Sequence, residues 1–141
     1  MIILSIVGSS GSGKTTLIEK LVPELAKMGY RVAVVKHAHK GFEIDVKGKD
    51  SQRIFDAGAD VAVVSEEKVA IFRRISLQDI LKFFQDYDIV LLEGFSKLHF
   101  PKIALDNREY ENVVFRYNGN FEDVLSFITS LLKSDCGGKL N

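Results

Sequence analysis

Several features that restrict a protein's function are scarce in this sequence. Its 141 residues include one cysteine, two prolines and no tryptophan. The single cysteine, Cys136, can form no internal disulfide, so a small secreted domain held by disulfides is not expected. Cys136 also lies in a polar stretch with no base beside it, which argues against a cysteine nucleophile.

Long hydrophobic runs and an excess of one charge are also missing. The longest apolar stretches, such as VAVV and IVLL, are far too short to cross a bilayer. The start, MIILSIVG, lacks the charged region and cleavage site of a signal peptide. Lys and Arg total 19, as do Asp and Glu, so no overall field attracts nucleic acid or an anionic membrane. We therefore expect a cytoplasmic protein that binds neither, and any anion site must be local.

One segment, GSSGSGKTT (Gly8–Thr16), is unusually rich in glycine and hydroxyl groups. It fits the P-loop pattern G-x-x-x-x-G-K-[ST], with a predicted strand before it and a predicted helix after it. The glycines let backbone N–H groups curl around a polyphosphate, and the helix aims its positive end at the same place. The predicted phosphate-binding residues are Gly8, Ser9, Ser10, Gly11, Ser12, Gly13, Lys14, Thr15 and Thr16. The plainer alternative is a Gly/Ser-rich turn that caps a helix.

The expected roles within this loop follow from its side chains. Lys14 reaches the β- and γ-phosphates, Thr15 holds Mg²⁺, and the Thr16 hydroxyl meets the α-phosphate. Glu93 emerges at the carboxyl end of the apolar strand IVLL, where open α/β sheets place their ligands. We expect Glu93 to hold the metal with Thr15, and Lys14 and Glu93 to be the catalytic residues. The alternative makes Glu93 a solvated carboxylate at a strand end.

The apolar periodicity along the chain predicts an α/β fold. Strands are predicted over 2–7, 31–36, 88–94, 102–105 and 111–117, and a hairpin over 61–73 with its turn at Glu66–Glu67. Helices are predicted over 14–28, 50–57, 76–87 and 120–133, with Pro23 kinking or breaking the first. Together with the P-loop, this order indicates a P-loop NTPase-like three-layer fold with a mostly parallel sheet and an antiparallel hairpin. We expect one nucleotide-binding domain over 1–133 and a disordered tail over 134–141.

A basic segment follows the second predicted strand. It contains Lys36–Lys40, then Asp45, then Lys47–Ser51. His37 and His39 share one face of an extended chain, but no further cysteine or histidine cluster supports a zinc site. We interpret the segment as an anion-binding rim beside the P-loop, formed by Lys36, His37, His39, Lys47 and Lys49. A solvated basic loop is the alternative.

Three stretches taken in order resemble one family. GSSGSGKTT, VVKHAHKGFEIDVKGKDSQRIFDAGAD and IVLLEGFSKLHFPKI are similar to the MobB family of molybdopterin-guanine dinucleotide biosynthesis adaptors, over about residues 2–105. The resemblance implies a GTP-binding P-loop protein, usually a homodimer, with weak GTP hydrolysis. Such proteins assist MobA, which attaches GMP to molybdopterin. It further implies that Asp45 joins Thr15 and Glu93 near Mg²⁺, and that Lys47–Ser51 lies near the nucleotide and the partner-facing surface.

The sequence leaves other readings open. After residue 105 it has no clear N/TKxD guanine-reading motif, so the residues alone do not choose between GTP and ATP, and Asn118 and Asn120 are candidate base contacts. A small-molecule or nucleoside kinase would need an arginine-bearing lid, and Arg73–Arg74 is the only arginine pair. A nucleotide-gated metallochaperone would use His37 and His39. The apolar hairpin offers a strand edge for a homodimer.

Overall fold

The computed structural model describes residues 1–38, 41 and 49–139. The chain divides into two compact units, the first formed by residues 1–37 and 83–141 and the second by residues 38–82. The single domain predicted over 1–133 stays a prediction. Among the described residues, no helix combines the length and apolar character that a membrane span requires.

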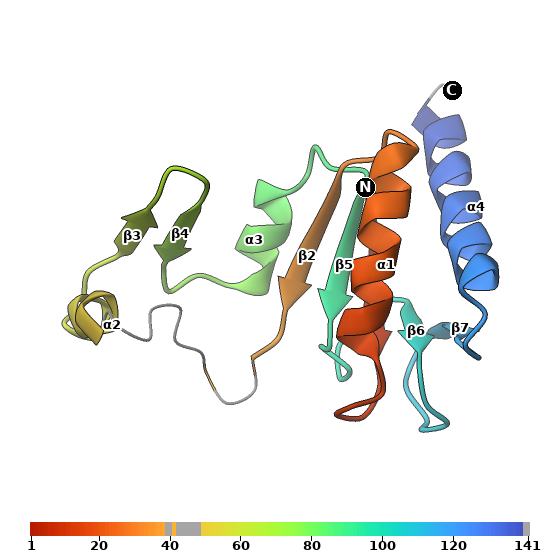
Figure 1. Ribbon diagram of the computed structural model, residues 1–141, viewed down its shortest axis with the longest axis horizontal. Helices are drawn as coiled ribbons and strands as arrows, with labels where there is room; N and C mark the ends of the chain where they lie inside the picture. The colour runs from red at the N-terminus through yellow and green to blue at the C-terminus, as the bar shows by residue number, and fades with distance from the viewer. Residues whose placement is uncertain (39–40, 42–48, 140–141) are drawn as a thin grey trace. The chain divides into compact units, whose positions relative to one another are not determined.

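The first unit is built on a five-stranded sheet (Figure 1). Its strands are β1 (Ile2–Val7), β2 (Val32–Lys36), β5 (Ile89–Glu93), β6 (Lys102–Ala104) and β7 (Val113–Arg116). They lie in the order β2-β5-β1-β6-β7, and every neighbouring pair is parallel. The carboxyl ends of the strands therefore meet at one edge, and Figure 1 shows the loops after β1, β5 and β6 together there. This parallel sheet and the hairpin of the second unit confirm the predicted α/β class.

Two helices, α1 (Lys14–Lys27) and α4 (Phe121–Lys139), cover one face of this sheet. Their apolar sides and alternate strand residues form one buried core, which includes Leu4, Ile6, Leu21, Leu25, Leu91, Ile103 and Ile128. Helix α1 continues without interruption through Pro23, so the break that the sequence suggested at this proline does not occur. Pro23 is exposed, and water can solvate the carbonyl group that its missing N–H leaves free.

The last helix is longer than its sequence suggested. Asn120 caps it as predicted, since its Oδ1 accepts a hydrogen bond from the Asp123 amide at 3.2 Å. The helix then continues beyond its predicted end at Lys133 to Lys139, while the disordered tail predicted over 134–141 stays a prediction. A contact of 3.3 Å between the Met1 ammonium and Asp135 Oδ2 fastens this extension to the start of β1.

The second unit contains α2 (Lys49–Asp56), β3 (Val61–Val64), β4 (Val69–Phe72) and all but the last residue of α3 (Leu77–Phe83). Strands β3 and β4 form the predicted antiparallel hairpin, with Val64 opposite Val69 across the turn. Helix α3 begins at the predicted capping box, where Ser76 Oγ accepts the Asp79 amide and Asp79 Oδ2 accepts the Ser76 amide. It ends at Phe83, four residues before the predicted end at Tyr87.

Candidate phosphate-binding site

The loop after β1 can form only because of its glycines. Gly11 and Gly13 have positive φ angles of 78° and 97°, which residues with a side chain rarely adopt. A Cβ atom on Gly8 would lie 2.4 Å from Ser12 Oγ, so a side chain at that position would require Ser12 to shift. Gly13 is the N-cap of α1, so the loop passes directly into the amino end of the helix. This is the geometry in which backbone N–H groups and a helix terminus face one anion.

Lys14 turns back over this loop. Its Nζ donates hydrogen bonds to the carbonyl oxygens of Gly8, at 2.8 Å, and Ser9, at 3.2 Å. The ammonium therefore lies against the first two residues of the loop, and it marks the end of the loop where β- and γ-phosphates are expected. Within the described part of the chain, the buried Ser12 Oγ makes no hydrogen bond. A phosphate would draw Lys14 from weak carbonyl acceptors to stronger anionic ones.

The predicted metal pair is brought together on one side of the loop. Thr15 Oγ1 donates a hydrogen bond of 2.9 Å to Glu93 Oε1, across 78 positions of sequence. Lys36 Nζ lies 4.0 Å from the same carboxylate oxygen, and the Glu93 side chain is only 12% exposed. A hydroxyl and a carboxylate are hard oxygen ligands, and Mg²⁺ is usually held by one or two such groups with water and phosphate oxygens. The residues fit the ion, and its binding stays a prediction.

The loop after Glu93 begins with two residues in left-handed backbone conformations. Gly94 has a φ of 93°, and Phe95 has a φ of 56°, which is rare for an aromatic residue. The Phe95 ring stacks on the His37 ring, with centroids 4.7 Å apart and planes 19° apart. The His37 amide also donates to the Glu93 carbonyl at 3.0 Å. The carboxyl ends of β2 and β5 are therefore joined beside the Glu93 carboxylate.

The predicted basic rim is described only in part. Lys36 and His37 lie beside Glu93, as the preceding contacts show. His39, Asp45 and Lys47 lie outside the described residues, and Lys49 is the first residue of α2 in the second unit. The roles of these residues stay predictions. Among the described residues, no group of three or more His, Cys, Asp or Glu side chains is arranged to hold a metal ion.

An acidic residue that we did not predict lies on the other side of the loop. Asp106 follows the end of β6, and its Oδ2 accepts the backbone amide of Ser9 at 2.8 Å. Its Oδ1 accepts the Tyr110 hydroxyl at 3.0 Å and the Arg108 amide at 3.2 Å. Burial alone would raise the pKa of Asp106, but these three hydrogen bonds and the charge of Arg108 together outweigh it and lower that pKa below its usual value. Asp106 is therefore a stable carboxylate bound to the loop backbone.

Two arginines complete this side. Arg108 Nε lies 3.8 Å from Asp106 Oδ2, and the Arg108 side chain is 69% exposed. Arg116 Nη1 donates to the Asp106 carbonyl at 2.7 Å, and its Nη2 donates to the Arg108 carbonyl at 3.1 Å. The backbone of residues 106–108 is thus held by Arg116, while the guanidinium of Arg108 extends from it into solvent.

A buried lysine connects the loops of both sides. Lys102 has no exposed surface, and its Nζ donates to the carbonyl oxygens of Leu98, Phe100 and Glu111. Leu98 and Phe100 belong to the loop that follows Glu93, and Glu111 belongs to the segment that follows Asp106. Burial lowers the pKa of Lys102, and the nearby charge of Glu111 partly opposes this.

The reasoning that found Glu93 could also have found Asp106. Each is an acidic residue at the carboxyl end of a strand that neighbours β1. No pattern in the sequence pointed to Arg108 or Tyr110. The two candidate base contacts have local partners: Asn118 Oδ1 accepts the Asn120 amide at 3.0 Å, and Asn120 caps α4.

The chain is similar to proteins of known family. It matches the family described as "Molybdopterin guanine dinucleotide synthesis protein B" over residues 3–130. The molybdopterin-guanine dinucleotide biosynthesis adapter protein of Haemophilus influenzae is 43% identical in an alignment of 114 positions that covers 76% of this chain and 64% of the relative. The Escherichia coli K12 adapter protein is 34% identical in an alignment of 116 positions that covers 73% of this chain and 64% of the relative. The chain thus spans 64% of the length of both curated relatives.

Solved structures agree with this match. A crystal structure of molybdopterin-guanine biosynthesis protein B (mobB) has a TM-score of 0.67 and 34% identity, covering 94% of this chain and 99% of that one. Bacillus subtilis MobB has a TM-score of 0.70 and 24% identity, covering 92% of this chain and 97% of its own. The second likeness supports the fold alone.

Proposed function

The chain belongs to the molybdopterin guanine dinucleotide synthesis protein B family, and on this premise we propose that it is a Mg²⁺–GTP-binding adapter that assists attachment of GMP to molybdopterin. The observation that carries the proposal is the hydrogen bond between Thr15 and Glu93 beside the glycine loop. It supports the proposal because a hydroxyl and a carboxylate beside the glycine loop are the groups with which a P-loop protein holds the metal of a bound triphosphate. Lys14 lies at the same loop and supplies the cation for the terminal phosphates.

The choice of guanine rests on the relatives. Both curated relatives are adapters in the biosynthesis of molybdopterin-guanine dinucleotide. This dinucleotide contains a guanine nucleotide. Asn118 and Asn120 follow β7 at the edge of the sheet that carries the loop. Their side-chain oxygens cap the local backbone, so an amide N–H₂ group is what either side chain offers to a base.

Hydrolysis is proposed to be slow. Fast phosphoryl transfer requires positive charge held against the transition state, commonly by an arginine finger worth roughly 10³-fold or more. Neither the glycine loop nor the stretch from Glu93 to Pro101 contains an arginine. Arg108 lies near the loop but is 69% exposed, and electrostatic catalysis is strongest where water is excluded.

An adapter implies a biosynthetic partner, and we propose that this is MobA or its pterin substrate, molybdopterin. The proposed contact for an anionic pterin or partner is the basic rim, formed by Lys36, His37, His39, Lys47 and Lys49. A cytoplasmic homodimer is also proposed, since Val64, Val69 and Ile71 of the hairpin are 70%, 56% and 64% exposed. Charge-removing variants of Lys47 and Lys49 should weaken pterin or partner binding and spare GTP, and equal loss of GTP would place these lysines in the nucleotide site.

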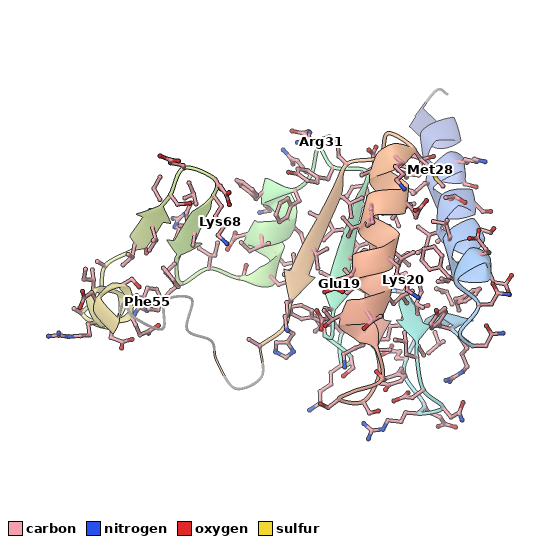
Figure 2. The ribbon with its side chains drawn as sticks, viewed as in Figure 1. Glu19, Lys20, Met28, Arg31, Phe55 and Lys68 are labelled. Atoms are coloured by element: carbon pink, nitrogen blue, oxygen red, sulfur yellow. The ribbon has the colours of Figure 1, made fainter. Side chains whose placement is uncertain are left out.

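Titration calorimetry with GTP and ATP, each with Mg²⁺ or with EDTA, tests the nucleotide assignment. We expect Mg²⁺-dependent binding that favours GTP. In Lys14→Ala the affinity for GTP should fall about 100-fold or more, because the charge-assisted hydrogen bonds of Lys14 to the β- and γ-phosphates are removed. Lys20→Ala is the matched control, since Lys20 is an exposed lysine on the same helix (Figure 2). Wild-type affinity in Lys14→Ala would refute the P-loop assignment, and brisk turnover without a partner would favour a kinase or an independent NTPase.

A further inference from the structure

Arg108 lies close to Ser9, at the end of the glycine loop where the β- and γ-phosphates are expected. Asp106 Oδ2 is 2.8 Å from the Ser9 amide and 3.8 Å from Arg108 Nε, so one oxygen links the guanidinium to Ser9. Lys14 Nζ, the group that reaches the β- and γ-phosphates in a P-loop, donates to the Ser9 carbonyl at 3.2 Å. Arg108 and Lys14 therefore approach the same residue of the loop, from β6 and from α1.

The two parts of Arg108 are held very differently. Its backbone is fixed, because its amide donates to Asp106 Oδ1 and its carbonyl accepts from Arg116 Nη2. Its guanidinium is mostly exposed, forms a long ion pair with Asp106 and also interacts with the Tyr110 side chain. Exposed contacts of this kind contribute little to stability. The head group can consequently rotate away from Asp106 at small cost, while two hydrogen bonds hold the backbone of residue 108.

A polyphosphate would change the balance at Asp106. A carboxylate so close to Ser9 repels a bound anion, and a cation beside it reduces that repulsion. A phosphate carries more negative charge than a carboxylate and presents oxygens that match the guanidinium fork. The Arg108 head group should therefore exchange Asp106 for a phosphate when one is bound nearby.

We propose that Arg108 is a phosphate-contacting residue that binds the γ-phosphate of the nucleotide and so favours the triphosphate over the diphosphate. This inference rests on the proposed nucleotide-binding function. Because the exposed guanidinium binds the ground state and the transition state alike, it raises affinity for the triphosphate and leaves the rate of hydrolysis slow.

The variant Arg108→Ala tests this, because the hydrogen bonds of the residue 108 amide and carbonyl to Asp106 and Arg116 use its backbone and remain in the variant. Calorimetry with Mg²⁺–GTP and Mg²⁺–GDP should show GTP affinity reduced about fivefold, as for one exposed charge-assisted contact, and GDP affinity unchanged. Arg108→Lys should recover part of the loss. Arg31→Ala is the control, since Arg31 stacks over Tyr87 beside the amino end of β2, away from the glycine loop (Figure 2).

The outcomes separate this inference from the function on which it rests. Unchanged GTP affinity in Arg108→Ala, or equal losses of GTP and GDP, would overturn the role of Arg108 while wild-type binding still supports the P-loop assignment. Loss of GTP preference in Arg31→Ala as well would attribute the effect to net charge and also overturn it. A wild-type protein that binds neither nucleotide would overturn the proposed function itself.

Discussion

Two carboxylates flank the glycine loop, and they use their oxygens differently. On the Glu93 side, defined by Thr15, Glu93 and Lys36, the carboxylate accepts a side-chain hydroxyl and lies near an ammonium. On the Asp106 side, defined by Ser9, Asp106, Arg108 and Tyr110, it accepts two backbone amides and a phenol. Side-chain partners can exchange for a metal ion, whereas backbone amides hold the loop in place. The comparison assigns chemistry to Glu93 and loop geometry to Asp106.

A variant that disturbs the Glu93 side and the Asp106 side of the loop together should have the largest effect on stability. Lys102→Met keeps the aliphatic volume but leaves the carbonyl oxygens of Leu98, Phe100 and Glu111 without their shared donor. We expect the free energy of unfolding to fall by about 2–4 kcal/mol, because the fully buried Lys102 ammonium is the shared donor to three carbonyl groups. Urea denaturation measures this. The exposed Lys97→Met in the same loop is the control, and equal stability of the two variants would contradict the role of Lys102.

The variant Glu93→Gln should remove the Mg²⁺ dependence that we assign to the Glu93 side and not to the Asp106 side. It keeps the size of the side chain but removes the charge that would attract a cation, so GTP affinity in Mg²⁺ should fall about 10- to 100-fold, as when metal-site partners are lost. The difference between Mg²⁺ and EDTA should nearly disappear. Asp106→Asn should retain that difference. Calorimetry in both buffers checks this, and an unaltered Mg²⁺ dependence in Glu93→Gln would remove Glu93 from the metal site.

Asp106 should tolerate the loss of its charge better than the loss of its oxygen. An asparagine oxygen can still accept the Ser9 amide, so GTP affinity of Asp106→Asn should stay within about threefold of wild type. Asp106→Ala has no acceptor, and both its melting temperature and its GTP affinity should fall further. Thermal melts and calorimetry make the comparison. If Asn and Ala are equally damaging, the carboxylate does more than hold the loop.

The smallest predicted effect is on acid stability. The pKa of Asp106 is lowered in the folded protein, so its contribution to stability is present above the ordinary Asp value of about 4 and is lost as the pH falls through the lower folded value. The melting temperature of Asp106→Asn should therefore decline less steeply in acid than that of wild type. Asp79, whose pKa is lowered by its Ser76 hydrogen bonds, remains in both proteins. Parallel declines would contradict the assignment.

The sequence allowed prediction of those elements that follow from local pattern. The parallel strands, α1, the hairpin turn and the pairing of Thr15 with Glu93 all follow from apolar periodicity, glycine positions and one rule about strand ends. Arg108 could not be found this way, because its position depends on Arg116, which is eight residues away and folds the segment back. Phe95 is a similar case, since its left-handed backbone opposes its own preference and is supported by its contact with His37.

The hydrogen bonds that Lys14 makes to the Gly8 and Ser9 carbonyls also bear on how quickly a nucleotide can bind. The loop carries its own internal cation, so its curled backbone is stable before any phosphate arrives, and little conformational entropy remains to be lost on association. Binding is then an exchange of acceptors at one ammonium and requires no folding of the loop. Association should proceed at the rate typical of a preformed site, and differences in affinity between nucleotides should appear mainly in their dissociation rates.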